Sequence, residues 1–328
     1  MLKMELTQAI KQLKNLKAKK IFLQIPEGLK TKVEEITDEL EEAGFSVTTS
    51  MDPCFGACDL KQKDAKQLEC DAILHIGHTK FIQKTSMPIV YAPLKYELGE
   101  KFERITKILT EWLKDENILE IGLVTTAQFL EYLPILKEEL MKNKINAIIG
   151  KGERTENGQV LGCNYASANV KPKTIVYFGD GLFHPLGIHF ATQKEVIIAN
   201  PMNLEIKRLV EEKNEFLKRR ILLIERAKEA KNFAILVSTK EGQNRITDAE
   251  KIKKELEKKG KKAKLYIMDF IANDALLGIK AEALINTACP RISIDDHLQY
   301  KLPMINMAEV DYLLGKKKYE NYTLATVY

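Results

Sequence analysis

The sequence predicts an α/β protein made of three similar βαβ-type domains, whose parallel sheets lie in a pseudo-threefold arrangement around a shared centre. The first observation behind this prediction is a repeat, in which a compact apolar strand, a glycine-containing turn and a helix follow one another. Two copies, Lys20–Gly44 and Phe233–Gly260, end in the pattern Glu-Leu-Glu-x-x-Gly, and glycine suits the left-handed residue that ends a helix. The second observation is a cysteine after a strand-like run in each third of the chain. Strands separated by helices of this length predict right-handed βαβ connections.

The length of 328 residues predicts two or three domains, and the repeat favours three, over residues 1–97, 98–203 and 204–328. Apolar runs and helical periodicity define the elements of each domain. The first is expected to hold strands Lys20–Ile25, Phe45–Thr49 and Ala72–Ile76 and a helix over Thr31–Ala43. The second is expected to hold helices over Leu98–Trp112 and Phe129–Lys142 and strands Glu120–Thr125, Ile145–Ile149 and Thr174–Phe178. The third is expected to hold helices over Leu204–Lys231 and Ile246–Lys259 and strands Phe233–Ser238, Lys264–Met268 and Ala283–Ile285.

The composition predicts a surface of mixed charge. There are 51 Lys and Arg residues against 46 Asp and Glu residues, so the net charge is only +5. A nucleic-acid partner is not expected, because no helix-turn-helix, zinc-finger or RNP spacing occurs. A membrane-spanning helix is not expected either, because there is no run of about 18 uncharged apolar residues. The N-terminus lacks the apolar core of a signal peptide, which predicts a cytoplasmic protein.

The cysteines are the strongest candidates for a functional site. Five is an odd number and disulfides are rare in the cytoplasm, so metal or redox chemistry is the expected use of clustered thiols. Cys58, Cys163 and Cys289 each lie in a Gly- or Pro-flanked loop after a strand, in three different repeats. We expect these three residues to meet in space and to hold one iron–sulfur cluster. Three thiolates suit a [4Fe–4S] cluster with one iron left open for substrate.

The remaining cysteines and two histidines leave alternatives open. Cys54 stands four residues before Cys58, and Cys58 is the favoured ligand because a glycine beside it allows close approach of the backbone. Cys70 is expected to be structural, as most buried cysteines are. Three thiolates would also suit zinc, with His78 or His184 as a fourth ligand. Both histidines fit a substrate contact or a structural role equally well.

Three turns at strand ends are candidate ligand contacts. Pro26-Glu27-Gly28 and Thr239–Gln243 each join a strand to a helix, where backbone N–H groups can meet an anion. Gly179-Asp180-Gly181, followed by His184, is the stronger candidate, because an acidic residue between two glycines at a strand end often faces a ligand. Neither a P-loop nor a GxGxxG motif is present.

Taken together, these segments resemble one known family. GACD around Cys58, LGC at Cys163, the stretch GDGLFHP and the late loop with Cys289 resemble the archaeal 2-(3-amino-3-carboxypropyl)histidine synthases of diphthamide biosynthesis. The likeness extends over nearly the whole chain. It implies a homodimer in which three similar domains each give one cysteine to a central [4Fe–4S] cluster. It also implies an unconventional radical S-adenosylmethionine enzyme, without the compact CxxxCxxC motif and reduced by an external electron donor.

The resemblance also implies the reaction. The family generates a 3-amino-3-carboxypropyl radical from S-adenosylmethionine and adds it to the imidazole carbon of one histidine in elongation factor 2, releasing 5′-methylthioadenosine. Carried over to this sequence, the cluster ligands are Cys58, Cys163 and Cys289. We expect strand-end residues to hold the methionyl and ribose groups of S-adenosylmethionine, namely Gly179, Asp180, His184, Ser238, Thr239 and Gln243.

Two other functions fit part of the same pattern. Quinolinate synthases also pack three similar domains around a [4Fe–4S] cluster held by one cysteine from each, but they are dehydratases that do not react with S-adenosylmethionine. The second alternative is a non-enzymatic module whose thiols bind structural zinc, and such a protein would be colourless.

Overall fold

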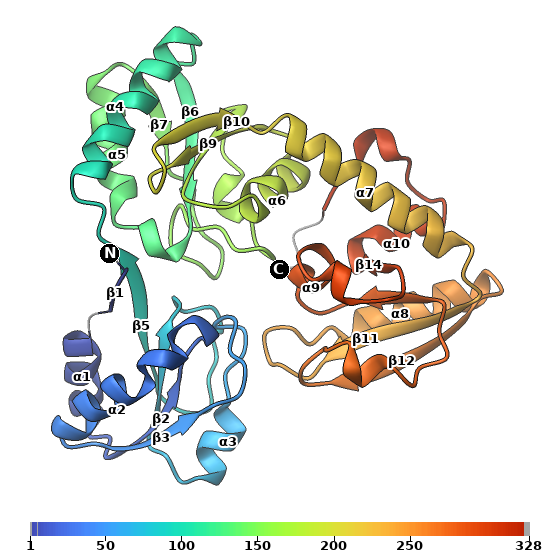
Figure 1. Ribbon diagram of the computed structural model, residues 1–328, viewed down its shortest axis with the longest axis horizontal. Helices are drawn as coiled ribbons and strands as arrows, with labels where there is room; N and C mark the ends of the chain where they lie inside the picture. The colour runs from blue at the N-terminus through green and yellow to red at the C-terminus, as the bar shows by residue number, and fades with distance from the viewer. Residues whose placement is uncertain (1, 5, 325–328) are drawn as a thin grey trace.

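The computed structural model describes residues 2–4 and 6–324 and consists of three α/β units that surround a common centre (Figure 1). Each unit has its own sheet, with the strand orders β1-β5-β4-β2-β3, β10-β9-β8-β6-β7 and β12-β11-β13-β14. Among the described strands, the pairings are parallel except that of β1 with β5 and that of β9 with β10. The predicted fold class of three similar α/β domains with mainly parallel sheets is therefore confirmed.

The first unit has a central strand that is buried along its whole length. Its strands are β1 (Leu2–Met4), β2 (Lys20–Gln24), β3 (Ser46–Ser50), β4 (Ala72–Gly77) and β5 (Ile89–Tyr96), and its helices are α1 (Leu6–Asn15), α2 (Val33–Glu42) and α3 (Gln62–Gln67). All six residues of β4 are buried, which explains its nearly continuous apolar sequence. Helix α2 ends before Gly44, whose φ of +94° is the left-handed conformation that the repeat predicts.

The second unit packs two helices on a sheet with an antiparallel edge. Its helices are α4 (Glu100–Asp115), α5 (Tyr132–Lys142) and α6 (Phe183–Thr192), and its strands are β6 (Glu120–Thr125), β7 (Asn146–Ile148), β8 (Thr174–Phe178), β9 (Glu195–Asn200) and β10 (Glu205–Arg208). Leu109 of α4 and Leu136 of α5 share one buried core with Val176 of β8. The amphipathic pattern of both helices therefore follows from their position on one face of the sheet.

The third unit is reached through the long helix α7, which leads from the second unit into the third (Figure 1). Its helices are α7 (Glu211–Lys228), α8 (Ile246–Lys258), α9 (Pro290–Ile294) and α10 (Val310–Leu313), and its strands are β11 (Asn232–Ser238), β12 (Lys262–Met268), β13 (Ala283–Asn286) and β14 (Met304–Asn306). Ile235 of β11, Ile252 of α8 and Ile224 of α7 are buried in its main core.

The structure adds strands that were not predicted, among them β5, β9 and β14, and it also differs from the predicted elements at two sheet edges. The helix expected over 204–231 begins at Glu211, because Glu205–Arg208 forms β10 against β9 instead. Arg208 holds this edge through ion pairs with Glu116 at 2.8 Å and Glu195 at 3.0 Å. At the N-terminus, β1 precedes helix α1 and pairs with β5, and this strand was not predicted. Both are short edge strands, and β10 has no fully buried residue to mark it in the sequence.

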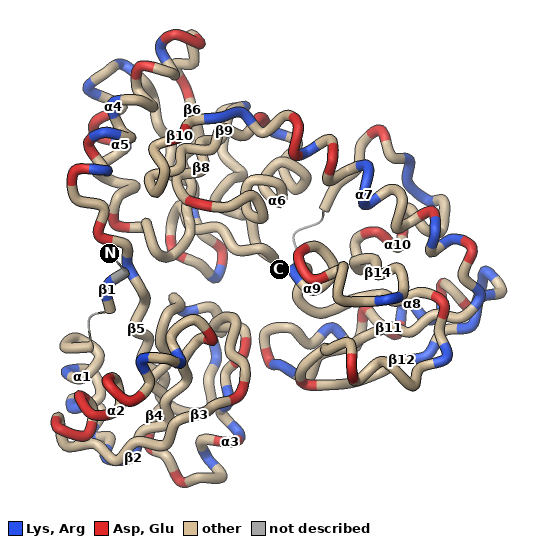
Figure 2. Tube along the Cα trace, in the orientation of Figure 1, with Lys and Arg blue, Asp and Glu red and all other residues tan. Residues whose placement is uncertain are grey.

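Charged residues of both signs are spread over the helices of all three units, although α2 of the first unit carries only acidic ones (Figure 2). This distribution agrees with the small net charge of +5. Within the described part of the chain, none of the helices combines the length and the apolar character that crossing a membrane requires.

Candidate functional site

Three cysteines from three units line a single cavity of about 210 Å³. Cys58 lies in the loop after β3, Cys163 in the loop between β7 and β8, and Cys289 directly after β13. The middle loop is held at the end of its sheet because Gln159 bridges Thr125, the last residue of β6. Loops at the carboxyl ends of parallel strands are where α/β sheets place their ligands. The structure thus brings together the three cysteines that the sequence predicted would meet.

The loop at 239–245, between β11 and α8, holds Cys58 from the third unit. The Gly242 N–H donates a hydrogen bond of 2.8 Å to the Cys58 carbonyl, and the Gln243 amide donates one of 3.3 Å to the Cys58 sulfur. A side chain at Gly242 is excluded, because its Cβ would lie 2.6 Å from the Cys58 Cα. These contacts fix the position of the cysteine between two units.

A buried ion pair next to Cys58 joins the same two units. Lys240 Nζ lies 2.5 Å from Asp59 Oδ2, and both side chains are buried. Lys240 also reaches Asp269 at 3.3 Å, and Lys61 binds the same Asp269 carboxylate at 2.8 Å. Removing one charge from a buried pair leaves the other uncompensated, so this contact favours one fixed arrangement of the two loops.

The second and third units meet beside Cys163 and Cys289. Gly162 lies so close to the Phe183 ring that a Cβ there would be 2.1 Å from the ring. The guanidinium of Arg291 lies over the same ring, 4.9 Å from its centroid. Cys289 precedes α9, and its carbonyl accepts a 2.8 Å hydrogen bond from the Asn286 side chain.

The three thiols stay protonated at neutral pH when nothing is bound to them. Burial raises the pKa of Cys58 and of Cys163, and it raises the pKa of Cys289 to about 12. Electrostatic repulsion between the sulfurs raises the pKa values further, since Cys58 raises the pKa of both Cys163 and Cys289. Metal coordination deprotonates thiols, so a metal centre bound by these cysteines would release their protons.

A second cavity adjoins the first and contains other predicted site residues. His184, Thr126 and Gln128 line both cavities, and Asp180 lines the second. Burial lowers the pKa of His184 to about 4, so its imidazole is neutral at physiological pH. The Asp180 carboxylate accepts a hydrogen bond of 2.8 Å from Asn200. The two adjoining cavities together are larger than a metal centre alone would fill.

The remaining predicted residues have different positions. Gly179 follows β8 directly and precedes Asp180. The hydroxyls of Ser238 and Thr239 both bind Asp269, at 3.4 and 3.2 Å, and neither residue is among the described residues that line the two cavities. Gln243 contacts the Cys58 sulfur rather than open space.

Sequence reasoning missed the residues that line the cavity between these loops. Arg291 lines the cavity but was not predicted. Its position two residues after Cys289, a candidate ligand, could have indicated it. Gln159 exchanges hydrogen bonds with Thr79 of the first unit at 2.8 and 3.0 Å, and this contact has no local signal in the sequence.

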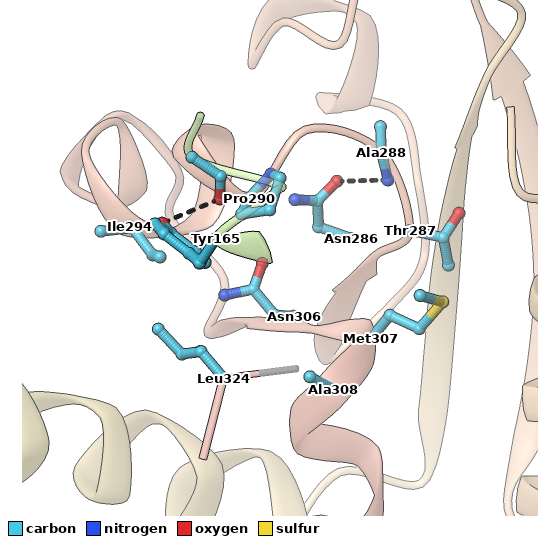
Figure 3. Close-up of a pocket in the computed structure, with 11 residues that line it drawn as sticks. Tyr165, Asn286, Thr287, Ala288, Pro290, Ile294, Asn306, Met307, Ala308 and Leu324 are labelled. Atoms are coloured by element: carbon cyan, nitrogen blue, oxygen red, sulfur yellow. Dashed lines mark hydrogen bonds between the residues drawn. The ribbon is translucent and has the colours of Figure 1, made fainter. Parts of the chain in front are cut away.

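A separate small cavity of about 70 Å³ lies behind the cysteine loops of the second and third units (Figure 3). Tyr165 borders it and donates a hydrogen bond of 3.1 Å to the Gly162 carbonyl. Across the cavity, the Asn286 side chain accepts a hydrogen bond of 3.0 Å from the Ala288 N–H. These bonds stabilise the chain immediately before Cys163 and before Cys289. The residues around this cavity therefore support the two cysteine loops.

Comparisons with known proteins agree with this geometry. The model of the diphthamide synthesis protein family matches residues 25–323. The chain is 36% identical to the 2-(3-amino-3-carboxypropyl)histidine synthase of Pyrococcus horikoshii, over 96% of this chain and 91% of that protein. It is 31% identical to the enzyme of the same name from Methanocaldococcus jannaschii, over 93% of this chain and 88% of that protein.

The fold is also similar to that of a solved structure. The crystal structure of Dph2 from Pyrococcus horikoshii with a 4Fe-4S cluster superposes with a TM-score of 0.91 at 33% identity. The match covers 100% of this chain and 95% of the crystallised one. With the family model spanning almost all of the sequence, the chain belongs to the diphthamide synthesis protein family.

Proposed function

We propose that this protein is a 2-(3-amino-3-carboxypropyl)histidine synthase that carries out the first step of diphthamide biosynthesis by a radical mechanism. It transfers the 3-amino-3-carboxypropyl group of S-adenosylmethionine to the imidazole carbon of a histidine in elongation factor 2 and releases 5′-methylthioadenosine. The observation that carries this proposal is the convergence of Cys58, Cys163 and Cys289 on one cavity. Relatives named for this activity align with nearly the whole chain, which supports the proposal.

The three cysteines fit a [4Fe–4S] cluster. Each borders the cavity and is only half-buried, so its sulfur can reach a group bound there. Three thiolates leave one iron without a protein ligand, and the bound cluster would supply an electron and an open iron site for a sulfonium substrate. The related Dph2 from Pyrococcus horikoshii has been crystallised with a 4Fe-4S cluster. In this chain, Gly242 and Gln243 would hold Cys58 in place.

The cavity next to the cysteines has groups suited to the substrate. Among the described residues that line it, Arg291 carries the only formal positive charge, which suits the carboxylate of the methionyl group. The neutral His184 and the acidic Asp180 border the adjoining space, where they are placed to meet the ribose hydroxyls. Gly179 directly precedes Asp180 at the end of β8. Ser238 and Thr239 hold the start of the 239–245 loop through Asp269, and Gln243 contacts the Cys58 sulfur.

Replacing Asp180 with alanine is expected to weaken S-adenosylmethionine binding about tenfold while the iron content stays unchanged. A hydrogen bond to a charged acceptor is worth ~1.5 kcal/mol or more, which corresponds to this factor. Calorimetric titration of the cluster-loaded protein measures the change. Glu205→Ala removes a carboxylate that lies outside the two joined cavities and serves as the matched control. Equal affinities of the two variants would reject the assignment of Asp180.

Replacing Gln243 with leucine is expected to make the reduction potential of the bound cluster about 60 mV more negative. The lost N–H···S hydrogen bond to Cys58 stabilises the electron-rich reduced state, and ~1.4 kcal/mol corresponds to this shift in a one-electron couple. A redox titration followed by electron paramagnetic resonance measures it. Gln62→Leu is the control, because Gln62 also joins the first and third units, through Glu241 at 2.6 Å, without touching a sulfur. A shift of the same size in both variants would show that loop packing, not the sulfur contact, sets the potential.

We further propose that the enzyme works as a cytoplasmic homodimer that receives electrons from an external donor. The absence of a membrane-spanning helix among the described residues and the family resemblance support this view. Light scattering during size-exclusion chromatography tests the oligomeric state.

The direct test of the transfer uses elongation factor 2 as acceptor. Reduced, cluster-loaded protein is incubated with S-adenosylmethionine and elongation factor 2, which is then digested and analysed by mass spectrometry. The proposal expects a 3-amino-3-carboxypropyl group on one histidine. An unmodified acceptor, in the presence of continuing S-adenosylmethionine cleavage, would show that the substrate is a different molecule.

A further inference from the structure

A second cluster of metal-binding side chains lies in the first unit and uses none of the three cysteines described above. Cys54, His75 and His78 each offer one ligand atom, and these atoms all lie within 4.8 Å of one another. Cys54 and His75 are buried, and His78 is half-buried. The residues come from two segments, the loop after β3 and the end of β4.

The backbone at the end of β4 is shaped to bring the two histidines together. In a continuous strand, residues three apart point to opposite faces of the sheet. Gly77 breaks this pattern with a φ of +91°, and His78 then turns back toward His75. As a result, His75 Nε2 lies 3.0 Å from His78 Nδ1. A side chain at Gly77 would also collide with Pro26, since its Cβ would lie 2.9 Å from the proline ring.

Cys54 and His78 have backbone hydrogen-bond partners, at Gly56 and Ile76, whereas one ring nitrogen of His75 has none. His75 Nδ1 is buried and has no hydrogen-bond partner. The other nitrogen, Nε2, faces only the second imidazole, so the two rings share a single proton between them. The neighbouring aromatic ring, Tyr91, lies edge-on to His75 at 5.7 Å between centroids, and its hydroxyl is likewise buried without a partner. A buried imidazole nitrogen and a buried hydroxyl that both lack partners, next to a thiol and a second imidazole, are unusual unless something binds there.

We propose that Cys54, His75 and His78 form a second metal site that binds a Zn²⁺ ion. Zinc prefers thiolate and imidazole ligands, with bonds of about 2.3 Å to sulfur and about 2.0–2.1 Å to nitrogen. In a tetrahedral site such ligand atoms lie ~3.3–3.8 Å apart, so ligand atoms that now lie within 4.8 Å of one another would move by up to about 1 Å on binding. On binding, zinc displaces the proton between the rings and the proton of the Cys54 thiol, and both protons are released to solvent.

A fourth ligand can reach the proposed zinc ion, and the ion links two parts of the first unit. His78 also lines the cavity that Cys58, Cys163 and Cys289 border, so a water molecule from this side completes the coordination. Cys54 stands in the same loop as Cys58, and β4 is a central, fully buried strand. The ion therefore ties the loop that carries Cys58 to the rigid core of the first unit.

The test measures zinc and iron in the same sample. Anaerobically purified, cluster-reconstituted full-length protein is incubated with zinc chloride, desalted and analysed by mass spectrometry for both metals. X-ray absorption at the zinc edge then identifies the ligands without interference from iron. The expected result is a stoichiometric amount of zinc bound to one sulfur and two nitrogens. Cys54→Ser and His78→Gln are expected to lose at least nine-tenths of the zinc and to keep their iron, which also shows that these variants fold.

Two control variants make the result specific. Cys70→Ala removes a buried thiol elsewhere in the first unit, and His184→Gln removes the other histidine that lines the cavity. Both are expected to retain zinc. Zinc bound by sulfur alone, or zinc lost equally in His184→Gln, would assign the ion to the three-cysteine site and overturn the proposal. Absence of bound zinc in the unmodified protein would overturn it as well. Because iron is measured independently, neither result depends on the proposed synthase activity.

Discussion

Replacing Cys58, Cys163 or Cys289 with alanine, one at a time, is expected to abolish retention of the iron–sulfur cluster. All three thiols border one cavity, and each is supplied by a different unit of the fold. With one ligand lost, two thiolates remain for four iron atoms, and the cluster is exposed to solvent and breaks down. The measurement is the iron and sulfide content of anaerobically purified protein, together with its brown absorption.

Two other cysteines provide the controls for this experiment. Cys70 is buried beside α3 and its sulfur lies 3.9 Å from the Leu68 carbonyl, away from the cavity. Cys54 is also buried and is not among the described residues that line the cavity. Alanine variants of both are expected to keep the full iron content. A Cys163→Ala protein that stayed brown with its iron intact would remove Cys163 from the ligand set.

Replacing Arg220 with methionine is expected to lower the free energy of unfolding of the third unit by about 3–5 kcal/mol. Arg220 lies on α7 with only 1% of its side chain exposed, and its guanidinium binds both carboxylate oxygens of Glu309 at 2.5 and 2.8 Å. It also donates to the carbonyls of Ser293 and Met304, at 2.6 and 3.2 Å. The variant leaves a buried carboxylate without its counter-charge. Chemical denaturation followed by circular dichroism measures the loss.

The Arg220→Met experiment has a control variant on the same helix and a compensating double variant. Arg219→Met changes the adjacent, exposed arginine and is expected to alter stability by less than about 0.5 kcal/mol. Combining Arg220→Met with Glu309→Leu removes both charges, and the double variant is expected to recover most of the loss. If Arg220→Met unfolded at the same denaturant concentration as Arg219→Met, the buried pair would not be a determinant of stability.

The core of each unit could be predicted from the sequence because its signals are local. Strands β4 and β11 are buried almost throughout and appear as short apolar runs. Gly44 and Gly260 mark helix ends because both take positive φ values that favour glycine. The convergence of the three cysteines was predictable from their repeated place after a strand, and their role as cluster ligands stays a prediction.

Contacts between the units could not be predicted, because they join residues that are far apart and carry no pattern of their own. Lys240 and Asp59 are 181 residues apart and form a buried pair only after two loops have met. Ser238 and Thr239 have the sequence context of a ligand-binding turn, yet both hydroxyls bind Asp269 in the folded protein. The contact between the His75 and His78 rings likewise depends on the left-handed conformation of Gly77, which lies between them.

The most direct test of the account is the identity of the nucleoside that the protein releases from S-adenosylmethionine. Anaerobically purified, cluster-reconstituted and dithionite-reduced protein is incubated with S-adenosylmethionine, and the products are separated by chromatography. The account predicts 5′-methylthioadenosine, formed by unmodified protein and absent with Cys58→Ala. Release of 5′-deoxyadenosine instead, or no cleavage by protein with a full complement of iron, would contradict it.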